Sequence, residues 1–279
     1  MGSSTRLVAL LGDPVGQSVS PAMHNAAFEA AGADLVYVAA AVSGDQFSEA
    51  VDGLYALGAV GANVTVPHKR AAWELAETLG PMAEAAGAVN TLVRTPTGWS
   101  GHNTDVDGFA APLRATGADL TGTRALVIGA GGAARAAVLA LRDGFGLARV
   151  DVAARRVEQA EALVRDLRGG SAELCAVPLG DADDNARLVV NATSVGMHSP
   201  HDTPCPDARF QPEQIIYDLV YGPEPTQLVR DATAAGATTL DGLAMLVGQA
   251  AGAFRLWTGQ EMNTDLALRV ARRALADRR

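Results

Sequence analysis

The chain has almost no lysine: of its 22 basic residues, only Lys69 is a lysine, and the others are arginines. An arginine stays protonated up to a pH of about 12, whereas burial and neighbouring charges can bring a lysine toward its neutral form. Among the basic residues, Lys69 is therefore the candidate for a general acid or base. A surface lysine that survived by chance in an arginine-rich composition is the alternative, and the count alone does not decide between them.

Cysteine and long apolar runs are also scarce. The two cysteines, Cys175 and Cys205, form no C-x-x-C pair, and we expect a reducing cytoplasmic location without a signal peptide. The most apolar stretch, residues 243–254, is interrupted by glycines and falls short of the ~20 residues that a membrane span requires. These absences predict a protein that does not partner with a membrane.

Positive charge is not concentrated anywhere. The formal net charge is −9, and the arginines are scattered, so we expect no nucleic-acid partner. The five histidines have no metal-ligand spacing of the H-E-x-x-H kind, and we expect no metal. A chain of 279 residues, 48% of them hydrophobic, can form one large domain or two ordinary ones.

Strand-like and helix-like patterns alternate along the chain, which predicts an α/β fold with mainly parallel sheets. In the first half we expect strands at 6–12, 35–42, 61–65 and 89–94, and helices at 21–31, 45–57 and 67–79. In the second half we expect strands at 124–128, 149–153, 188–191 and 214–218, and helices at 132–142 and 157–167. Residues 242–279 read as almost all helix, and we expect them to return to the first domain.

The second half opens with a strand, a G-x-G-x-x-A turn and a helix, at residues 126–136. Glycines at these positions let the backbone approach a pyrophosphate, which lies at the helix N-terminus. The flanking strand and helix favour a Rossmann-like dinucleotide site, although such a turn by itself is often only a tight turn.

The end of the second strand of this domain distinguishes the two nicotinamide cofactors. An NAD site usually has an acidic residue there, which binds the ribose 2′-hydroxyl. This chain has Ala154, Arg155 and Arg156 instead, and Asp151 lies inside the strand. Two arginines can hold a 2′-phosphate, so the pattern favours NADP, with an ordinary exposed helix start as the alternative.

Two polar clusters stand out in the first half. Ser18 and Ser20 precede a helix start, where a carboxylate would be favoured, and Ser20 before Pro21 is also a suitable N-cap. Asp105 begins the helix that leads into the second domain, where it could be a structural cap. Paired with Lys69, it would instead form a carboxylate and ammonium couple suited to proton transfer.

Together these segments resemble the shikimate dehydrogenase family along nearly the whole chain. The resemblance rests on the S-x-S-P core of residues 12–25 and the N-V-T-V-P-H-K segment 63–69. It continues through segments 87–92, 103–105, 129–136, 191–197, 217–226 and 242–249.

The resemblance implies a role for each residue at a matching position. Lys69 and Asp105 would be the catalytic pair. The substrate-binding residues would be Ser18 and Ser20 for the carboxylate, and Thr65, Asn90, Asp105, Tyr221 and Gln249 for the ring hydroxyls or the carboxylate. The cofactor-binding residues would be Gly129, Ala130, Gly131, Gly132 and Ala133 at the pyrophosphate, Ala154, Arg155 and Arg156 at the adenosine phosphate, and Leu219, Gly242 and Met245 at the nicotinamide. The family often has Asn-Arg-Thr at residues 154–156, so here an amide contact is lost and the second arginine replaces it.

The resemblance also implies an activity and an organisation. The activity is NADPH-dependent reduction of 3-dehydroshikimate to shikimate, in a monomer or homodimer. Residues 1–104 and 240–279 would form the substrate-binding domain, and residues 105–239 the NADP-binding domain. A quinate or dual quinate/shikimate dehydrogenase is the nearer alternative, and a catalytically silent NADP-binding sensor is the other.

Overall fold

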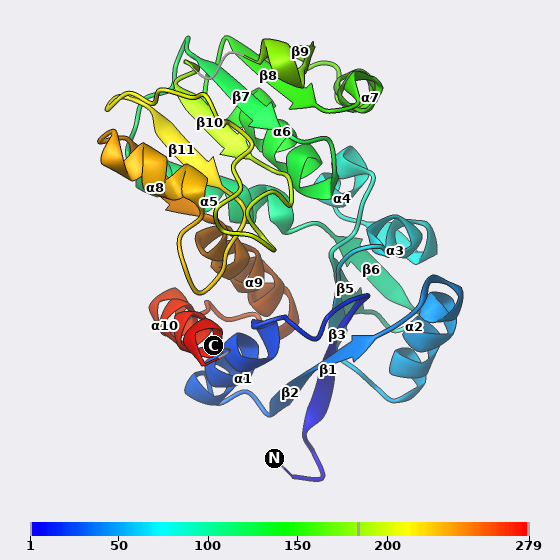
Figure 1. Cartoon of the computed structure of the whole chain (residues 1–279). Coiled ribbons are helices and arrows are strands. Elements are labelled where there is room, and N and C mark those ends of the chain that lie inside the picture. Colours follow the sequence, from blue (N-terminus) through cyan, green and yellow to red (C-terminus); the bar gives the residue numbers. More distant parts are fainter. Residues whose placement is uncertain (1, 183–184, 278–279) are drawn as a thin grey trace. The chain divides into compact units, whose positions relative to one another are not determined.

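The computed structural model describes residues 2–182 and 185–277, and the contacts of the chain divide it into two compact units (Figure 1). The first unit comprises Met1–Thr104 and Val247–Arg279, and the second comprises Asp105–Leu246. Arg278 and Arg279, which end the predicted C-terminal helical stretch, lie outside the described residues. The substrate-binding and NADP-binding roles of the two predicted domains stay predictions.

The first unit is built on a six-stranded sheet with the order β2-β1-β3-β5-β6-β4. Its strands are β1 (Arg6–Gly12), β2 (Leu35–Ala41), β3 (Gly61–Val64), β4 (Thr78–Leu79), β5 (Thr91–Arg94) and β6 (Trp99–His102). Its N-terminal helices are α1 (Ser20–Ala30), α2 (Phe47–Ala56), α3 (Lys69–Leu75) and α4 (Pro81–Ala86), with a short 3-10 turn at Gly44–Gln46.

The central strands of this sheet are parallel, and β5 is the exception. β1 pairs in parallel with both β2 and β3, whereas β5 runs antiparallel to β3 and β6. The carboxyl ends of β1, β3 and β6 and the start of β5 therefore lie at the same edge of the sheet. Ligands of open α/β sheets bind at such an edge.

Both faces of this sheet are covered by helices, so its central strands are mainly apolar, with Asn63 as a polar exception on β3. Figure 1 shows α2 on one side of β1 and α1 on the other. The C-terminal helix α10 (Thr264–Ala276) packs against α1, and Phe254 of α9 (Gly242–Thr258) stacks on Phe28 with ring centroids 5.4 Å apart. The last helices therefore return to the first unit because their apolar faces pack against α1.

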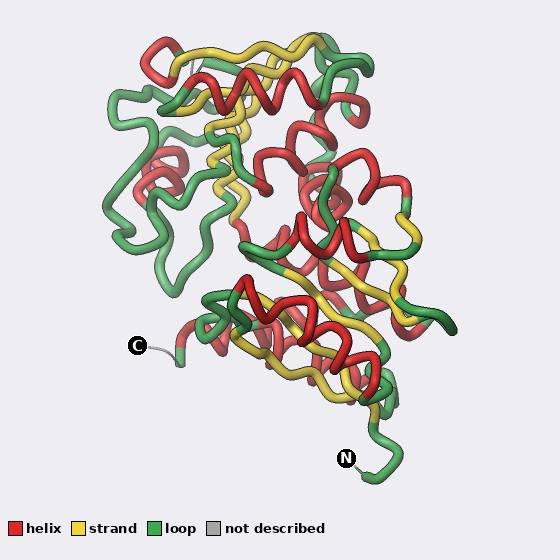
Figure 2. The backbone as a smooth tube through the Cα atoms, turned by 90° about the vertical axis from the view of Figure 1, so that its right-hand side faces the viewer, coloured by secondary structure: helices red, strands yellow, loops and turns green. Residues whose placement is uncertain are grey.

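The second unit contains a fully parallel sheet with the order β12-β11-β10-β7-β8-β9. Its strands are β7 (Arg124–Ile128), β8 (Arg149–Ala154), β9 (Glu173–Pro178), β10 (Leu188–Asn191), β11 (Ile215–Asp218) and β12 (Thr238–Asp241). Its helices are α5 (Asp105–Ala115), α6 (Gly132–Gly144), α7 (Val157–Asp166), α8 (Gln227–Ala234) and the start of α9, with a 3-10 turn at Leu179–Asp181. Figure 2 shows the helices in red against the yellow strands.

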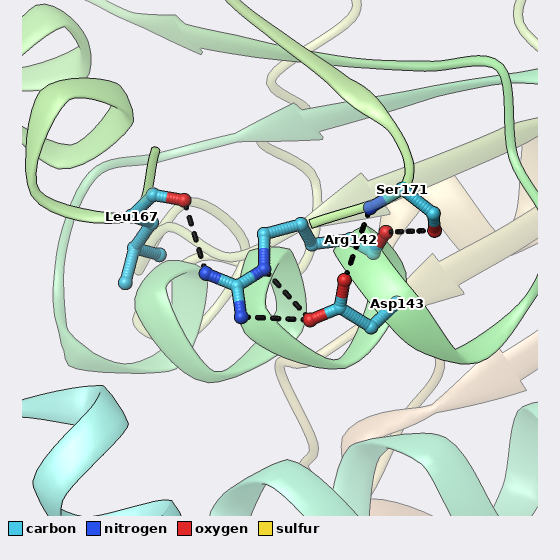
Figure 3. A network of polar contacts seen from close by, with 4 residues as sticks. All are labelled: Arg142, Asp143, Leu167 and Ser171. Atoms are coloured by element: carbon cyan, nitrogen blue, oxygen red, sulfur yellow. Dashed lines mark hydrogen bonds and ion pairs between the residues drawn. The ribbon is translucent and has the colours of Figure 1, made fainter. Parts of the chain in front are cut away.

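Alanine shapes the packing of α6, because its small buried side chains let the helix lie close to β7 and to α5. A polar network then fastens the end of α6 to the segment between α7 and β9 (Figure 3). The Arg142 guanidinium donates to Asp143 and to the Leu167 carbonyl oxygen, 3.1 Å away. Ser171 donates its N–H to Asp143 and its hydroxyl to the Arg142 carbonyl oxygen.

The α/β class and the mainly parallel sheets are confirmed, but some predicted bounds are wrong. The helix expected over 67–79 is limited to Lys69–Leu75, since Ala76 is extended and the next residues pair with β6. The N–H of Glu77 donates to the Trp99 carbonyl oxygen, so sheet pairing ends the helix early. The predicted strand at 89–94 begins only at Thr91.

Several elements of the structure were not predicted. They are α4, β6 and the short strand β4 in the first unit, and α8 and the strands β9 and β12 in the second. β9 and β12 lie at the two edges of the parallel sheet, and their side chains are only partly buried. An edge strand faces solvent on more sides than a central one, so its sequence need not be as apolar as that of a central strand, as Thr238, Thr239 and Asp241 of β12 show.

Candidate active site

The loop between β1 and α1 places Ser18 and Ser20 at the carboxyl edge of the first sheet. The prediction that Ser20 caps α1 is wrong, because the helix already begins at Ser20 and Val19 before it has helical backbone angles. A residue inside the first turn cannot act as the N-cap. The Ser18 hydroxyl oxygen instead accepts the Ser20 N–H at 3.2 Å.

Ser20 belongs to a buried chain of polar groups that crosses three strands. Its hydroxyl lies beside the hydroxyl of Tyr37 on β2, where it partly offsets the effect of burial on the tyrosine pKa. Tyr37 donates to the Asn63 side-chain oxygen on β3 at 2.8 Å. Asn63 donates its amide to the Asn90 carbonyl oxygen and to the Thr91 hydroxyl, both at 3.1 Å. These bonds join β2 to β3 and to the start of β5.

An aromatic layer encloses this polar chain. His24 of α1 stacks on Tyr37 with ring centroids 4.4 Å apart and lies 5.5 Å from the Trp257 ring. Burial lowers the pKa of His24 to about 3 and raises that of Tyr37. Both side chains are therefore neutral near pH 7, so this part of the site is organised by hydrogen bonds rather than by charge.

Asn90 brings together residues from distant parts of the sequence. Its amide donates to the Thr104 hydroxyl at 3.0 Å and to the Gln249 side-chain oxygen at 3.3 Å. Its side-chain oxygen accepts the Thr104 N–H at 2.8 Å. The predicted substrate-binding residues Asn90 and Gln249 are thus in direct contact, although 159 positions separate them.

Lys69 lies at the same edge of the sheet as Asn90. It is the first residue of α3 and half-buried, and its carbonyl oxygen accepts the Val89 N–H at 2.9 Å. Thr65 follows β3 directly and donates its N–H to the Leu11 carbonyl oxygen. The ring of His68 is buried against the Val42 carbonyl oxygen, which holds the start of α3.

Asp105 and Tyr221, the other predicted partners of the substrate, belong to the second unit. Asp105 is the first residue of α5 and buried. Tyr221 follows β11 and is half-buried. Their pairing with residues of the first unit stays a prediction.

The glycine turn of the second unit has the geometry that the motif predicts. Gly129 follows β7 directly and has a φ of +123°, and a Cβ there would lie 2.7 Å from the Ala192 carbonyl oxygen. A side chain is therefore excluded both by conformation and by space. Gly131 and Gly132 lead into α6 with open space where a Cβ would project, and the half-buried Ala130 and Ala133 flank them. Free backbone N–H groups at this helix N-terminus suit a phosphate.

Exposed arginines stand at the end of β8, as predicted. Ala154 is the buried last residue of the strand, and Arg156 occupies the N-cap position of α7 without a side-chain cap. Arg155 lines a pocket of about 480 Å³ together with β7, the turn after β9 and residues 204–208. Asp151 is buried within β8 and held by Arg149 at 2.7 Å, so it is not at the strand tip.

The predicted nicotinamide-side residues meet at the start of α9. A Cβ on Gly242 would collide with the Leu219 carbonyl group, so the two backbones are in contact. Met245 is buried one turn further along α9. Among residues 2–182 and 185–277, there is no cluster of His, Cys, Asp and Glu that could hold a metal ion. No helix in that part of the chain is long and apolar enough to cross a membrane.

A parallel sheet with a glycine turn leading into a helix N-terminus, and with arginines at the end of the next strand, defines a dinucleotide-binding protein of the Rossmann class. The sequence comparison narrows this class. The model of the shikimate dehydrogenase substrate binding domain matches residues 10–92, and that of the shikimate 5′-dehydrogenase C-terminal domain matches residues 242–272. The shikimate dehydrogenase (NADP(+)) of Salinibacter ruber is 45% identical, over 94% of this chain and 95% of its own. The chain belongs to the shikimate dehydrogenase family.

Solved structures agree with this assignment. A shikimate 5-dehydrogenase from Thermus thermophilus, in complex with NADP(H) and shikimate, has a TM-score of 0.87 and 40% identity, covering 97% of this chain and 100% of its own. A quinate dehydrogenase from Corynebacterium glutamicum, in complex with NAD, has a TM-score of 0.89 and 33% identity, covering 95% and 98%. The predicted family resemblance is confirmed.

Sequence reasoning missed the residues that hold the predicted ones in place. In the first unit these are Tyr37, Asn63, Thr91 and Thr104, and in the second they are Asn191, Asp218 and Thr226. Most of them lie inside the motifs that carried the resemblance. A polar residue within an apolar strand, such as Asn63 or Asp218, was the available signal, because buried polar groups must find partners.

Proposed function

We propose that the protein catalyses the reversible, NADPH-dependent reduction of 3-dehydroshikimate to shikimate. The observation that carries this proposal is the 45% identity, over 94% of the chain, to a relative named as an NADP(+) shikimate dehydrogenase. The protein is accordingly an oxidoreductase that acts on a secondary alcohol. The quinate alternative is less favoured, because its usual companion is an acidic residue where Arg155 stands.

The second unit fits NADP. The open space beside Gly131 and Gly132, ahead of the α6 N-terminus, would take the pyrophosphate, and Arg155 and Arg156 would hold the 2′-phosphate. Leu219, Gly242 and Met245 would border the nicotinamide. When bound, NADPH supplies the hydride that reduces the substrate carbonyl carbon.

Lys69 would transfer the accompanying proton. In the reductive direction its ammonium donates a proton to the carbonyl oxygen as that oxygen becomes a hydroxyl, and in the reverse direction the neutral amine removes it. Asp105 would orient Lys69 and stabilise its charged form. Their places at the starts of α3 and α5 support these roles, since the Val89 N–H bond to the Lys69 carbonyl oxygen fixes the start of α3 and the Asn90 side chain holds Thr104 just before α5.

Neutral hydrogen-bonding groups would bind the rest of the substrate. The hydroxyls of Ser18 and Ser20 would hold its carboxylate near the N-terminus of α1, where the helix dipole favours negative charge. Thr65, Asn90, Tyr221 and Gln249 would contact the ring hydroxyls or the carboxylate. We expect these small molecules to be the only partners of a cytoplasmic monomer or homodimer, with no nucleic acid or membrane.

A matrix of initial rates tests the proposal, with shikimate and quinate each measured against NADP and NAD. The expected result is that shikimate with NADP gives the highest kcat/KM. Quinate with NAD as the best pair would instead establish the quinate alternative. NADP binding without turnover of any pair would establish a silent sensor.

A further inference from the structure

One buried carboxylate in the second unit has no role in the proposed mechanism. Asp218 is the last residue of β11, with a relative exposure of 0%. Burial raises its pKa, and three hydrogen bonds partly offset that effect. One oxygen accepts the Asn191 side-chain amide at 2.9 Å and the Val220 N–H at 3.0 Å, and the other accepts the Thr226 hydroxyl at 2.5 Å. Hydrogen bonds to a charged group are stronger than neutral ones.

The first of these bonds fixes the turn after β10. Asn191 uses the same amide to donate to the Val195 carbonyl oxygen, and its side-chain oxygen accepts the N–H and hydroxyl of Thr193. The turn therefore closes on Asn191, which Asp218 holds in place. Ala192 within this turn lies against Gly129, where it leaves no room for a side chain.

The other bonds fix the turn after β11. The Val220 N–H bond to Asp218 sets the direction of the chain at Leu219, whose carbonyl group lies against Gly242. Thr226 is the N-cap of α8, where its hydroxyl oxygen also accepts the Val229 N–H at 3.3 Å. One carboxylate thus joins two turns and the start of a helix.

We propose that Asp218 is a positioning residue of the dinucleotide site: its carboxylate holds the 192–195 turn against Gly129 and the 219–220 turn against Gly242. The proposal rests on the proposed function, in which Gly129 borders the pyrophosphate and Gly242 the nicotinamide. Asp218 does not touch the cofactor and acts through the two turns. Loss of its bonds frees both turns and weakens NADP binding, while the groups of the first unit that recognise the substrate are unchanged.

Two replacements separate the charge of Asp218 from its shape. Asp218→Asn keeps the shape but replaces an acceptor by a donor, so Thr226 must reverse its hydrogen bond. Asp218→Ala removes all three bonds. Asp143→Asn is the matched control, because it makes the same change in the network of Figure 3, which fastens α6 and not the cofactor turns.

The experiment measures the dissociation constant of NADP by titration, and amide hydrogen exchange of the cofactor-free protein. The NADP dissociation constant should rise about tenfold or more in Asp218→Ala and less in Asp218→Asn. Exchange at residues 192–196 and 219–220 should accelerate in both variants without ligand. Asp143→Asn should change neither quantity.

Unchanged exchange in these turns and unchanged NADP affinity, in folded Asp218 variants, would overturn the proposal. If Asp218→Ala does not fold, Asp218→Asn and Thr226→Val carry the same test. Absence of shikimate turnover in the unmodified protein would refute the proposed function alone, because neither readout requires a reaction.

Discussion

The two units build their candidate sites in different ways. In the first unit, polar side chains from separate strands bond to one another, from Tyr37 through Asn63 and Thr91 to Asn90. In the second unit, backbone groups form the site, with glycines at Gly129 and Gly242 that leave no space for side chains. A site of side chains recognises a particular pattern of hydroxyls, whereas a site of backbone amides recognises a phosphate.

The two candidate sites should therefore respond differently to substitutions. A substitution in the first unit removes one contact and leaves its neighbours unsatisfied, at a cost of about 1–3 kcal/mol for each buried group. A substitution in the second unit acts on cofactor affinity, either by filling a glycine position or by removing a charge. Substrate and cofactor constants should therefore respond to separate sets of substitutions.

The largest expected effect is at Lys69, where the chemistry would occur. Lys69→Ala should lower kcat by about 10²–10⁴-fold, with a much smaller change in substrate affinity, because it removes the proton donor. Lys69→Arg should not restore the rate, since arginine keeps the charge but does not release a proton. Steady-state kinetics in both directions would measure this.

Neighbouring Arg70 supplies the control, because it is exposed and pairs with Glu74 on the surface of α3. Arg70→Ala should have nearly the unmodified kcat. A chemical test is also available, since amine-directed reagents can reach only Lys69 and the chain N-terminus. Full activity after complete modification of Lys69 would refute its role.

The second-largest effect concerns the cofactor. A 2′-phosphate held by Arg155 and Arg156 gains charge-assisted hydrogen bonds of about 1.5–3 kcal/mol each. Solvent screens these exposed side chains and reduces that free energy. The remainder still corresponds to a preference of about 10²-fold or more for NADP over NAD in kcat/KM. Replacing both arginines by alanine should abolish the preference by raising KM for NADP, with the NAD rate nearly unchanged.

Arg165→Ala with Arg168→Ala is the matched control, because both are exposed arginines of the same unit and their loss changes the net charge equally. That variant should keep the preference for NADP, and the dependence of NADP binding on salt concentration should also be unchanged. Equal kcat/KM for NADP and NAD in the unmodified protein would contradict the 2′-phosphate role and favour the quinate alternative.

The two regions also differ in how far the sequence predicted them. The glycine turn, the strand before it and the helix after it follow one another in the chain, so local patterns predicted these elements of the second unit closely. The bond from Tyr37 to Asn63 depends instead on the register of β2 and β3 against β1, which no local pattern contains. Helix α3 illustrates the same limit, because tertiary pairing of Glu77 with Trp99 overrode a helical pattern.

A smaller effect is expected at Ser20, and its readout is substrate affinity. A carboxylate ligand binds ground state and transition state alike, so Ser20→Ala should raise KM for shikimate more than it lowers kcat. Loss of one charged hydrogen bond costs about 1.5–3 kcal/mol, or roughly 10- to 100-fold. Ser48→Ala, at an exposed position of α2, is the control. An unchanged KM would show that Ser20 does not bind the substrate.

The smallest effect tests the polar chain of the first unit itself. Tyr37→Phe removes a hydroxyl that contacts Ser20 and Asn63 but none of the proposed ligands. It should leave a buried Asn63 oxygen unsatisfied and lower the free energy of unfolding by about 1–3 kcal/mol. KM for shikimate should rise a few-fold, because the hydroxyl beside Ser20 is lost, while KM for NADP should not change.

Tyr55→Phe provides the comparison, because its hydroxyl bonds only to the carbonyl oxygens of Thr95 and Pro96 in the same unit. It should leave KM for shikimate unchanged. If Tyr37 acts through Ser20, the double variant Ser20→Ala with Tyr37→Phe should raise KM little beyond Ser20→Ala alone, since coupled residues are not additive. Additive effects on KM would mean that the two hydroxyls act independently, and the first site would then be a set of separate contacts rather than one connected network.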